Sequence, residues 1–125
     1  MISTLYFNNN TEFVKVDLTK VAYVEADGNY CHVVFNNGHT ETVSVSLLQM
    51  QGLISKTLAQ GNRSHYARVG RKFIINTSTI VRVNVVRKHV VLCDHDHAPM
   101  VLEVPKESAR QLKQLLVNQI TNDKK

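Results

Sequence analysis

The sequence predicts a mainly β domain with one helix inserted midway and a second helix closing the chain. Short segments rich in Val, Ile and Thr recur along the chain, and turn-forming residues separate them. Two other stretches repeat apolar residues every three or four positions, which is the period of an amphipathic helix. A length of 125 residues suits one domain and is enough to bury a core without disulfides or metals.

The first part of the chain predicts strands joined by tight turns. The expected strands are "TLYF", "FVKVDL", "VAYVEA", "YCHVVF" and "HTETVSV". The polar run "NNNTE" separates the first two, whereas Asp27-Gly28 and Asn36-Asn37-Gly38 are hairpin turns whose residues tolerate positive φ. We therefore expect the last three of these strands to form a consecutive antiparallel set.

The period then changes from that of a strand to that of a helix. Apolar residues recur at three- and four-residue steps in Leu47, Met50, Leu53, Ile54 and Leu58. Ser46 is the expected N-cap, and Gly61-Asn62 is the expected stop signal. The sequence therefore predicts an amphipathic helix in the middle of the chain.

The second half of the chain predicts more strands and a closing helix. The expected strands are "YARV", "KFIIN", "IVRVNVV", "HVVLC" and "MVLEV", which bring the total to about eight to ten. The closing helix begins beside Pro105, and its apolar stripe, expected to pack on a sheet, is Ala109, Leu112, Leu115, Leu116 and Ile120. Residues 1–17 are expected to add strands to the same domain, and residues 121–125 to form a flexible tail.

Positive charge is concentrated in the centre of the chain. Between Thr42 and Cys93 there is no Asp or Glu, and this span holds eight of the 15 Lys and Arg residues. The rest of the chain holds the other seven cations and all ten acidic residues, so the centre has a net charge of +8 and the rest a net charge of −3. In particular, "RVGRKFIIN" carries three cations and no acidic residue close to them in sequence. A polyanion is the natural partner of such a field, because neutralising phosphates releases condensed counterions.

Several other functional classes find no support in the sequence. It contains no nucleophile elbow, phosphate-cradling glycine loop or paired-carboxylate pattern, so we expect no enzyme and no cofactor. The "DHDH" run is interpreted as a polar turn rather than a metal site, because a zinc site needs three or four rigidly held ligands. No apolar run is long enough to cross a membrane and no signal peptide is present, so we expect a cytoplasmic protein with two reduced cysteines.

The best candidates for recognition are side chains at turns. Arg71 and Lys72 lie between two expected strands, and Lys88 lies at another expected hairpin tip. The planar fork of Arg71 can grip a guanine edge or a phosphate, whereas lysine suits phosphate contacts. Asn29 and Tyr30 adjoin the first hairpin turn. If the strands have similar lengths, these turns gather on one recognition rim.

Several of these segments together match a known family. In order and at suitable spacing, "VAYVEADGNYCHVVF", "VSLLQM", "RVGRKFIINTSTIVRV" and "LEVPKE" resemble the LytTR-type DNA-binding domain of bacterial transcription regulators. The resemblance covers about Leu18 to Leu116, and we expect the domain to occupy residues 18–120. It implies an elongated antiparallel multi-sheet fold that binds duplex DNA through loops, unlike modules that place a helix in the groove. The receiver domain usual in response regulators is not part of this sequence, which fits either a stand-alone regulator or an excised domain.

The resemblance also implies particular contact residues and partners. Carried onto this chain, the contacts are Asn29, Tyr30, Cys31, Arg71, Lys72 and Lys106. Family members often have Arg-Ser where this chain has Arg71-Lys72 and Ser-Arg where it has Pro105-Lys106, so a phosphate contact is expected from Lys106. Members commonly recognise imperfect direct repeats through two copies, which implies paired binding or a homodimer on DNA.

Two alternatives remain beside a duplex-DNA regulator. A β-barrel that binds single-stranded DNA or RNA would also be basic and rich in strands, but such modules rely on aromatic stacking platforms, and this chain has four Tyr, four Phe and no Trp. A protein-interaction domain that uses a strand edge would leave the segregated positive charge unexplained.

Overall fold

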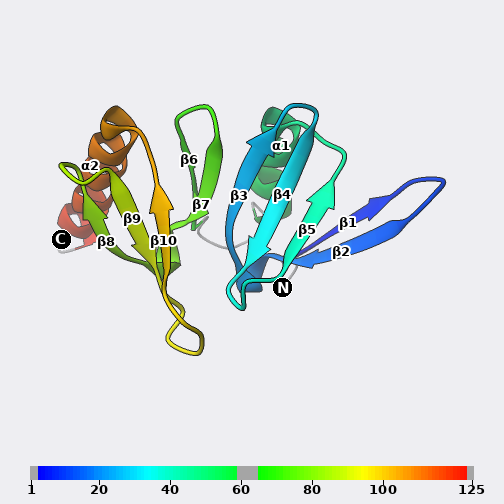
Figure 1. The fold of residues 1–125 in the computed structure, drawn as a ribbon, viewed down its shortest axis with the longest axis horizontal. Helices are drawn as coiled ribbons and strands as arrows, with labels where there is room; N and C mark the ends of the chain where they lie inside the picture. The colour runs from blue at the N-terminus through cyan, green and yellow to red at the C-terminus, as the bar shows by residue number, and fades with distance from the viewer. Residues whose placement is uncertain (1–2, 59–64, 124–125) are drawn as a thin grey trace. The chain divides into compact units, whose positions relative to one another are not determined.

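The computed structural model describes residues 3–58 and 65–123, and the chain divides into two compact units, Met1–Ser78 and Thr79–Lys125. The fold is mainly β, with three antiparallel sheets and two α-helices among the described residues, as the sequence predicts (Figure 1). The first unit contains β1 (Thr4–Asn8), β2 (Phe13–Asp17), β3 (Val21–Asp27), β4 (Tyr30–Phe35), β5 (Thr40–Val43), α1 (Leu47–Leu58), β6 (Tyr66–Val69) and β7 (Phe73–Asn76). The second contains β8 (Ile80–Asn84), β9 (His89–Leu92), β10 (Met100–Glu103) and α2 (Lys106–Asp123).

A five-stranded antiparallel sheet dominates the first unit. Its strand order is β5-β4-β3-β7-β6, so the predicted consecutive set β3-β4-β5 is confirmed. The partner on the other side of β3 is β7, with Val24 opposite Ile74, although some fifty residues separate them in sequence. This long-range pairing brings the turn before β7 to the end of β3.

One hydrophobic core joins the sheet, α1 and the β1-β2 ribbon. Leu5 and Val16 come from the ribbon, and Met50 and Ile54 come from α1, which lies behind β3 and β4 in Figure 1. Their burial against Val24 and its neighbours supplies the apolar stabilisation that a short helix lacks by itself. Leu53, expected in the buried stripe, is instead exposed at 37%.

The start of α1 is fixed by a reciprocal cap. The Gln49 backbone N–H donates to Ser46 Oγ at 3.2 Å, and the Ser46 N–H donates to Gln49 Oε1 at 2.9 Å. This is a capping box, which satisfies two amide donors that the first helical turn leaves without partners. The predicted N-cap is therefore confirmed, whereas the predicted stop at Gly61-Asn62 lies outside the described residues.

Asn76 closes β7 through its side chain. Its Oδ1 accepts hydrogen bonds from the Ser78 N–H at 3.1 Å and the Ser78 hydroxyl at 2.7 Å. Asn76 therefore acts as a turn former. The structure adds a second role, because the buried Nδ2 donates to the Val21 carbonyl at 2.8 Å and so ties the turn to the start of β3.

The second unit is a three-stranded sheet with a helix beside it. The order is β10-β9-β8, and α2 packs next to β8 (Figure 1). The first half of α2 buries Ala109 and Leu112 of the predicted stripe, together with Ser108. Leu115 and Ile120, also expected in the stripe, are instead 39% and 56% exposed, and the helix continues to Asp123. Neither α-helix of the described residues is long and apolar enough to cross a membrane.

Candidate nucleic-acid interface

Two hairpin loops lie side by side at one end of the five-stranded sheet. Glu25 pairs with Phe73, and the Ala26 N–H donates to the Lys72 carbonyl at 2.7 Å, so β3 ends where β7 begins. The β3-β4 loop is therefore next to the β6-β7 loop (Figure 1). Four of the sequence-predicted site residues, Asn29, Tyr30, Arg71 and Lys72, belong to this end.

Arg71 projects from a three-residue loop. Val69 pairs with Phe73, which leaves Gly70, Arg71 and Lys72 as the connection. Gly70 has a φ of 64°, in the left-handed region that glycine tolerates without a steric penalty. Arg71 is exposed and, within the part of the chain that the structure describes, forms no hydrogen bond or ion pair. Its guanidinium therefore keeps all of its donors available for a ligand.

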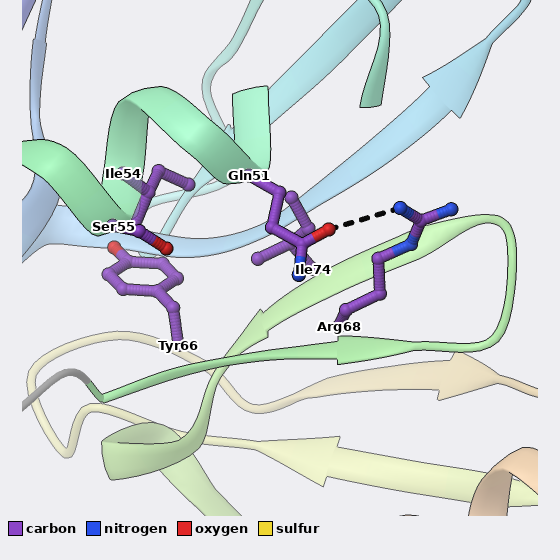
Figure 2. A pocket seen from close by; sticks show the side chains of 6 residues that line it. All are labelled: Gln51, Ile54, Ser55, Tyr66, Arg68 and Ile74. Atoms are coloured by element: carbon purple, nitrogen blue, oxygen red, sulfur yellow. Dashed lines mark hydrogen bonds between the residues drawn. The ribbon is translucent and has the colours of Figure 1, made fainter. Parts of the chain in front are cut away.

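Arg68 ties this loop to α1. Its Nε donates to the Gly70 carbonyl at 3.2 Å. Its Nη1 donates to Gln51 Oε1 at 3.1 Å (Figure 2). The pocket beneath, which Tyr66 and Ile54 also line, measures about 50 Å³. That volume suits a few waters and is too small for a nucleotide. Arg68 is exposed, and its two hydrogen bonds also fix the position of the loop that carries Arg71.

Lys72 is partly neutralised within its own sheet. Its Nζ lies 3.1 Å from Glu25 Oε2 and 5.7 Å from the centre of the Phe73 ring. No acidic residue is close to this cationic stretch in sequence, but the β3-β7 register brings Glu25 across from Phe73 and so next to Lys72. The positive field of the loop is weaker than the linear charge count indicates, and Arg71 becomes its principal free cation.

The β3-β4 loop presents Asn29 and Tyr30 but not Cys31. Gly28 has a φ of 61° at the first position of the two-residue connection, so the predicted tight hairpin is confirmed. Asn29 is exposed, and Tyr30 is 52% exposed. Cys31 is 0% exposed and belongs to the hydrophobic core, and burial raises the pKa of its thiol. This placement does not support a DNA contact through the Cys31 side chain.

A hydrogen-bonded chain beside this loop was not anticipated from the sequence. His32 Nδ1 lies 2.8 Å from Thr42 Oγ1, and His32 Nε2 lies 2.8 Å from Asp27 Oδ2. In the neutral tautomer that satisfies both contacts, the Nε2–H donates to Asp27 and the Thr42 hydroxyl donates to Nδ1. These residues link β3, β4 and β5 across the sheet, so His32 helps to hold the hairpin that carries Asn29 and Tyr30. The tight Asp27-Gly28 turn was the available signal, because it places residues 27 and 32 near each other on adjoining strands.

In the second unit, Lys88 and Lys106 lie at the same end of the three-stranded sheet. Glu103 pairs with His89, and the Val104 N–H donates to the Lys88 carbonyl at 3.0 Å, so the β8-β9 turn adjoins the segment that leads into α2. Both lysines are exposed. Lys106 is the first residue of α2, where the positive end of the helix dipole disfavours a cation by roughly 0.3–1 kcal/mol. Local stability therefore does not account for a lysine at this position.

The "DHDH" segment forms a polar turn between β9 and β10. Asp94 Oδ1 accepts from the backbone N–H groups of Asp96 and His97, and Asp94 Oδ2 lies 2.9 Å from His97 Nδ1. The hydrogen bond from His97 lowers the pKa of the Asp94 carboxyl. Among the described residues, no group of three or more His, Cys, Asp or Glu side chains could hold a metal ion.

Comparison with known proteins gives a consistent picture. The family model of the LytTr DNA-binding domain matches residues 11–117. A similar solved structure is the LytTr DNA-binding domain of a response regulator from Bacillus cereus, with 21% identity and a TM-score of 0.60 over 91% of this chain and 96% of that chain. No curated protein matches the sequence. At this identity the solved structure supports the fold, whereas the family model spans most of the chain. The chain therefore belongs to the LytTR family of DNA-binding domains.

Proposed function

We propose that this domain is the DNA-binding element of a transcription regulator, and that it reads duplex DNA in a sequence-specific way through its loops. The observation that carries the proposal is Arg71, an exposed arginine that has no hydrogen-bond or ion-pair partner among residues 3–58 and 65–123, on a loop that lies beside a second exposed loop. Arginine at such a position can form bidentate bonds to a guanine edge. The family supplies the coarser statement, a DNA-binding regulatory domain, and the loop geometry supports the finer one.

The exposed residues divide by the kind of contact that they can make. Arg71 reads a base edge, and Asn29 and Tyr30 contact the DNA from the neighbouring loop. Lys72, Lys88 and Lys106 contact phosphates, which position the domain without specifying sequence. Glu25 leaves Lys72 only partly available for this purpose.

Selection of bound duplexes from a random pool, repeated with single-stranded competitor, tests the proposal directly. We expect a recurrent duplex motif that the competitor does not remove. If about four phosphates are neutralised, log K falls against log salt with a slope of roughly −3 to −4. Selection of no motif, or an affinity independent of salt, would contradict the proposal.

We further propose that two copies bind imperfect direct repeats, as the family resemblance implies. Mobility shifts on one half-site and on two half-sites test this point. Two copies that bind the double site more tightly than independent sites allow would support paired binding on DNA. If each half-site binds with the same affinity in the double site as it does alone, the copies bind independently and paired binding is contradicted.

Single-stranded nucleic acid is the second candidate ligand, and one observation favours it. Tyr6 and Phe13 on the β1-β2 ribbon are 63% and 59% exposed, with ring centres 5.9 Å apart and planes at 30°. Exposed aromatic rings of this kind can stack on bases. The same selection experiment separates the two candidates, because the single-stranded competitor displaces duplexes from a protein that prefers single strands.

A further inference from the structure

The second unit carries an open apolar groove that the proposed DNA contacts do not use. It runs between β8 and α2 and has a volume of about 400 Å³. Leu116, Val117 and Ile120 line it from the helix, and Val81 lines it from the strand. Neither Lys88 nor Lys106 lines the groove, so its role is separate from DNA contact.

The helical wall of the groove is the half of α2 that the sheet leaves uncovered. The first half of the helix buries Ala109 and Leu112, whereas Val117 and Ile120 are 45% and 56% exposed. Residues 113, 116, 117 and 120 follow the i, i+3, i+4, i+7 pattern, so they form one stripe along the helix. Such a stripe is the kind of surface that an amphipathic partner covers.

The other wall is the edge of the three-stranded sheet. β8 is the last strand in the order β10-β9-β8, and four consecutive residues from Ile80 to Val83 line the groove. Side chains of consecutive strand residues point to opposite faces, so a surface that includes all four lies along the strand edge. Val81 is 54% exposed there.

The charges on the rim indicate what fits into the groove. The groove-lining residues include two cations, Arg82 and Lys113, and no acidic residue. Neither cation forms an ion pair or hydrogen bond within the described part of the chain. A second copy would bring its own Arg82 and Lys113 against these like charges, and DNA offers no apolar surface for Val117 and Ile120. We propose that this groove binds an acidic amphipathic helix of a partner protein, with its apolar residues in the groove and its carboxylates on Arg82 and Lys113.

Titration of the ¹⁵N-labelled 125-residue protein with a synthetic helical peptide tests this assignment. The peptide places Leu at i, i+3, i+4 and i+7 and Glu on the flanking positions, and its matched control replaces every Glu with Lys. We expect the Glu peptide to shift the amide signals of β8 and the second half of α2 saturably, and the Lys peptide to leave them unchanged. The double variant R82E/K113E should weaken the Glu peptide at least about tenfold and gain affinity for the Lys peptide.

Two further variants separate the possible failures. Lys56→Glu, an exposed lysine on α1 that does not line the groove, should leave peptide affinity within about twofold, since distant surface charges are screened. Ile120→Ser should weaken peptide binding while leaving DNA affinity unchanged, so the groove and the DNA interface are scored independently. Absence of groove shifts with the Glu peptide, or equal binding of both peptides, would overturn the proposal. A dimer in sedimentation that Ile120→Ser dissociates would also overturn it, by assigning the groove to a second copy.

Discussion

The β6-β7 and β8-β9 loops both present cations, but they distribute backbone strain differently. In the first, Gly70 takes the left-handed conformation with a φ of 64°, and Arg71 follows it. In the second, Lys88 itself has a φ of 58°. The left-handed region costs a residue with a side chain roughly 1–2 kcal/mol, whereas glycine enters it freely. In the β6-β7 loop, one residue takes the left-handed conformation and the next carries the charge. In the β8-β9 loop, Lys88 does both, and a role in binding would explain why this less stable arrangement is kept.

The largest effect on DNA affinity is expected at Arg71, the cation that follows the left-handed Gly70. Arg71→Ala should cost about 1–3 kcal/mol on the preferred duplex and less on random DNA, because it removes a bidentate base contact. Fluorescence anisotropy on both duplexes measures the difference. Arg71→Lys keeps the charge and loses the fork, so it should retain binding to random DNA while losing selectivity. Equal losses on both duplexes for Arg71→Ala would make this residue a phosphate contact instead.

A second prediction concerns the glycine that supports Arg71. Gly70→Ala should lower the free energy of unfolding by about 1–2 kcal/mol, because the new Cβ is strained at a φ of 64°. Gly52→Ala is the matched control, since Gly52 lies within α1 and an added Cβ would meet nothing within 4 Å. The control should raise the free energy of unfolding by about 0.5–1 kcal/mol. Urea denaturation that gives both changes the same sign would refute the assigned role of Gly70.

The strained lysine provides the converse experiment. Lys88→Gly should raise the free energy of unfolding by about 0.5–1 kcal/mol, because relief of the left-handed strain exceeds the entropy cost of glycine. The same change should weaken binding to all duplexes alike and make the salt slope shallower by about 1. Lys88→Ala removes the charge but keeps the strain, so it should reproduce only the loss of binding. If Lys88→Gly stabilises the fold and binds DNA unchanged, the β8-β9 turn lies outside the interface.

Local sequence signals were sufficient for most of the fold. The glycine at position 28 marked a hairpin because its φ of 61° is strained for other residues, and Ser46 marked a helix start because its hydroxyl accepts an amide hydrogen bond. Each signal acts over a few residues, so it can be read without knowing the rest of the chain. The pairing of β3 with β7 has no such local signal, because it depends on packing between distant segments.

The candidate site was harder to predict because it depends on that long-range pairing. The proximity of Glu25 to Lys72 follows from the β3-β7 register and not from any spacing in the sequence. The inward orientation of Cys31 was accessible, since it alternates with Val33, and both are buried on the core side of β4. The resemblance to the family pointed to the β3-β4 loop, and the period of the strand removes Cys31 from the contact residues that the resemblance implies.

The smallest predicted effect measures how strongly Glu25 restrains Lys72. Glu25→Gln removes the carboxylate that lies 3.1 Å from Lys72 Nζ, and the loss in unfolding free energy should stay within about 1 kcal/mol because the pair is partly exposed. With Lys72 released, affinity for all duplexes should rise modestly and the salt slope should steepen by about 1, since one more phosphate can be neutralised. Glu25→Gln combined with Lys72→Ala should abolish that steepening. If the single variant leaves the slope unchanged, Lys72 does not contact DNA, and Arg71 alone carries the recognition by this loop.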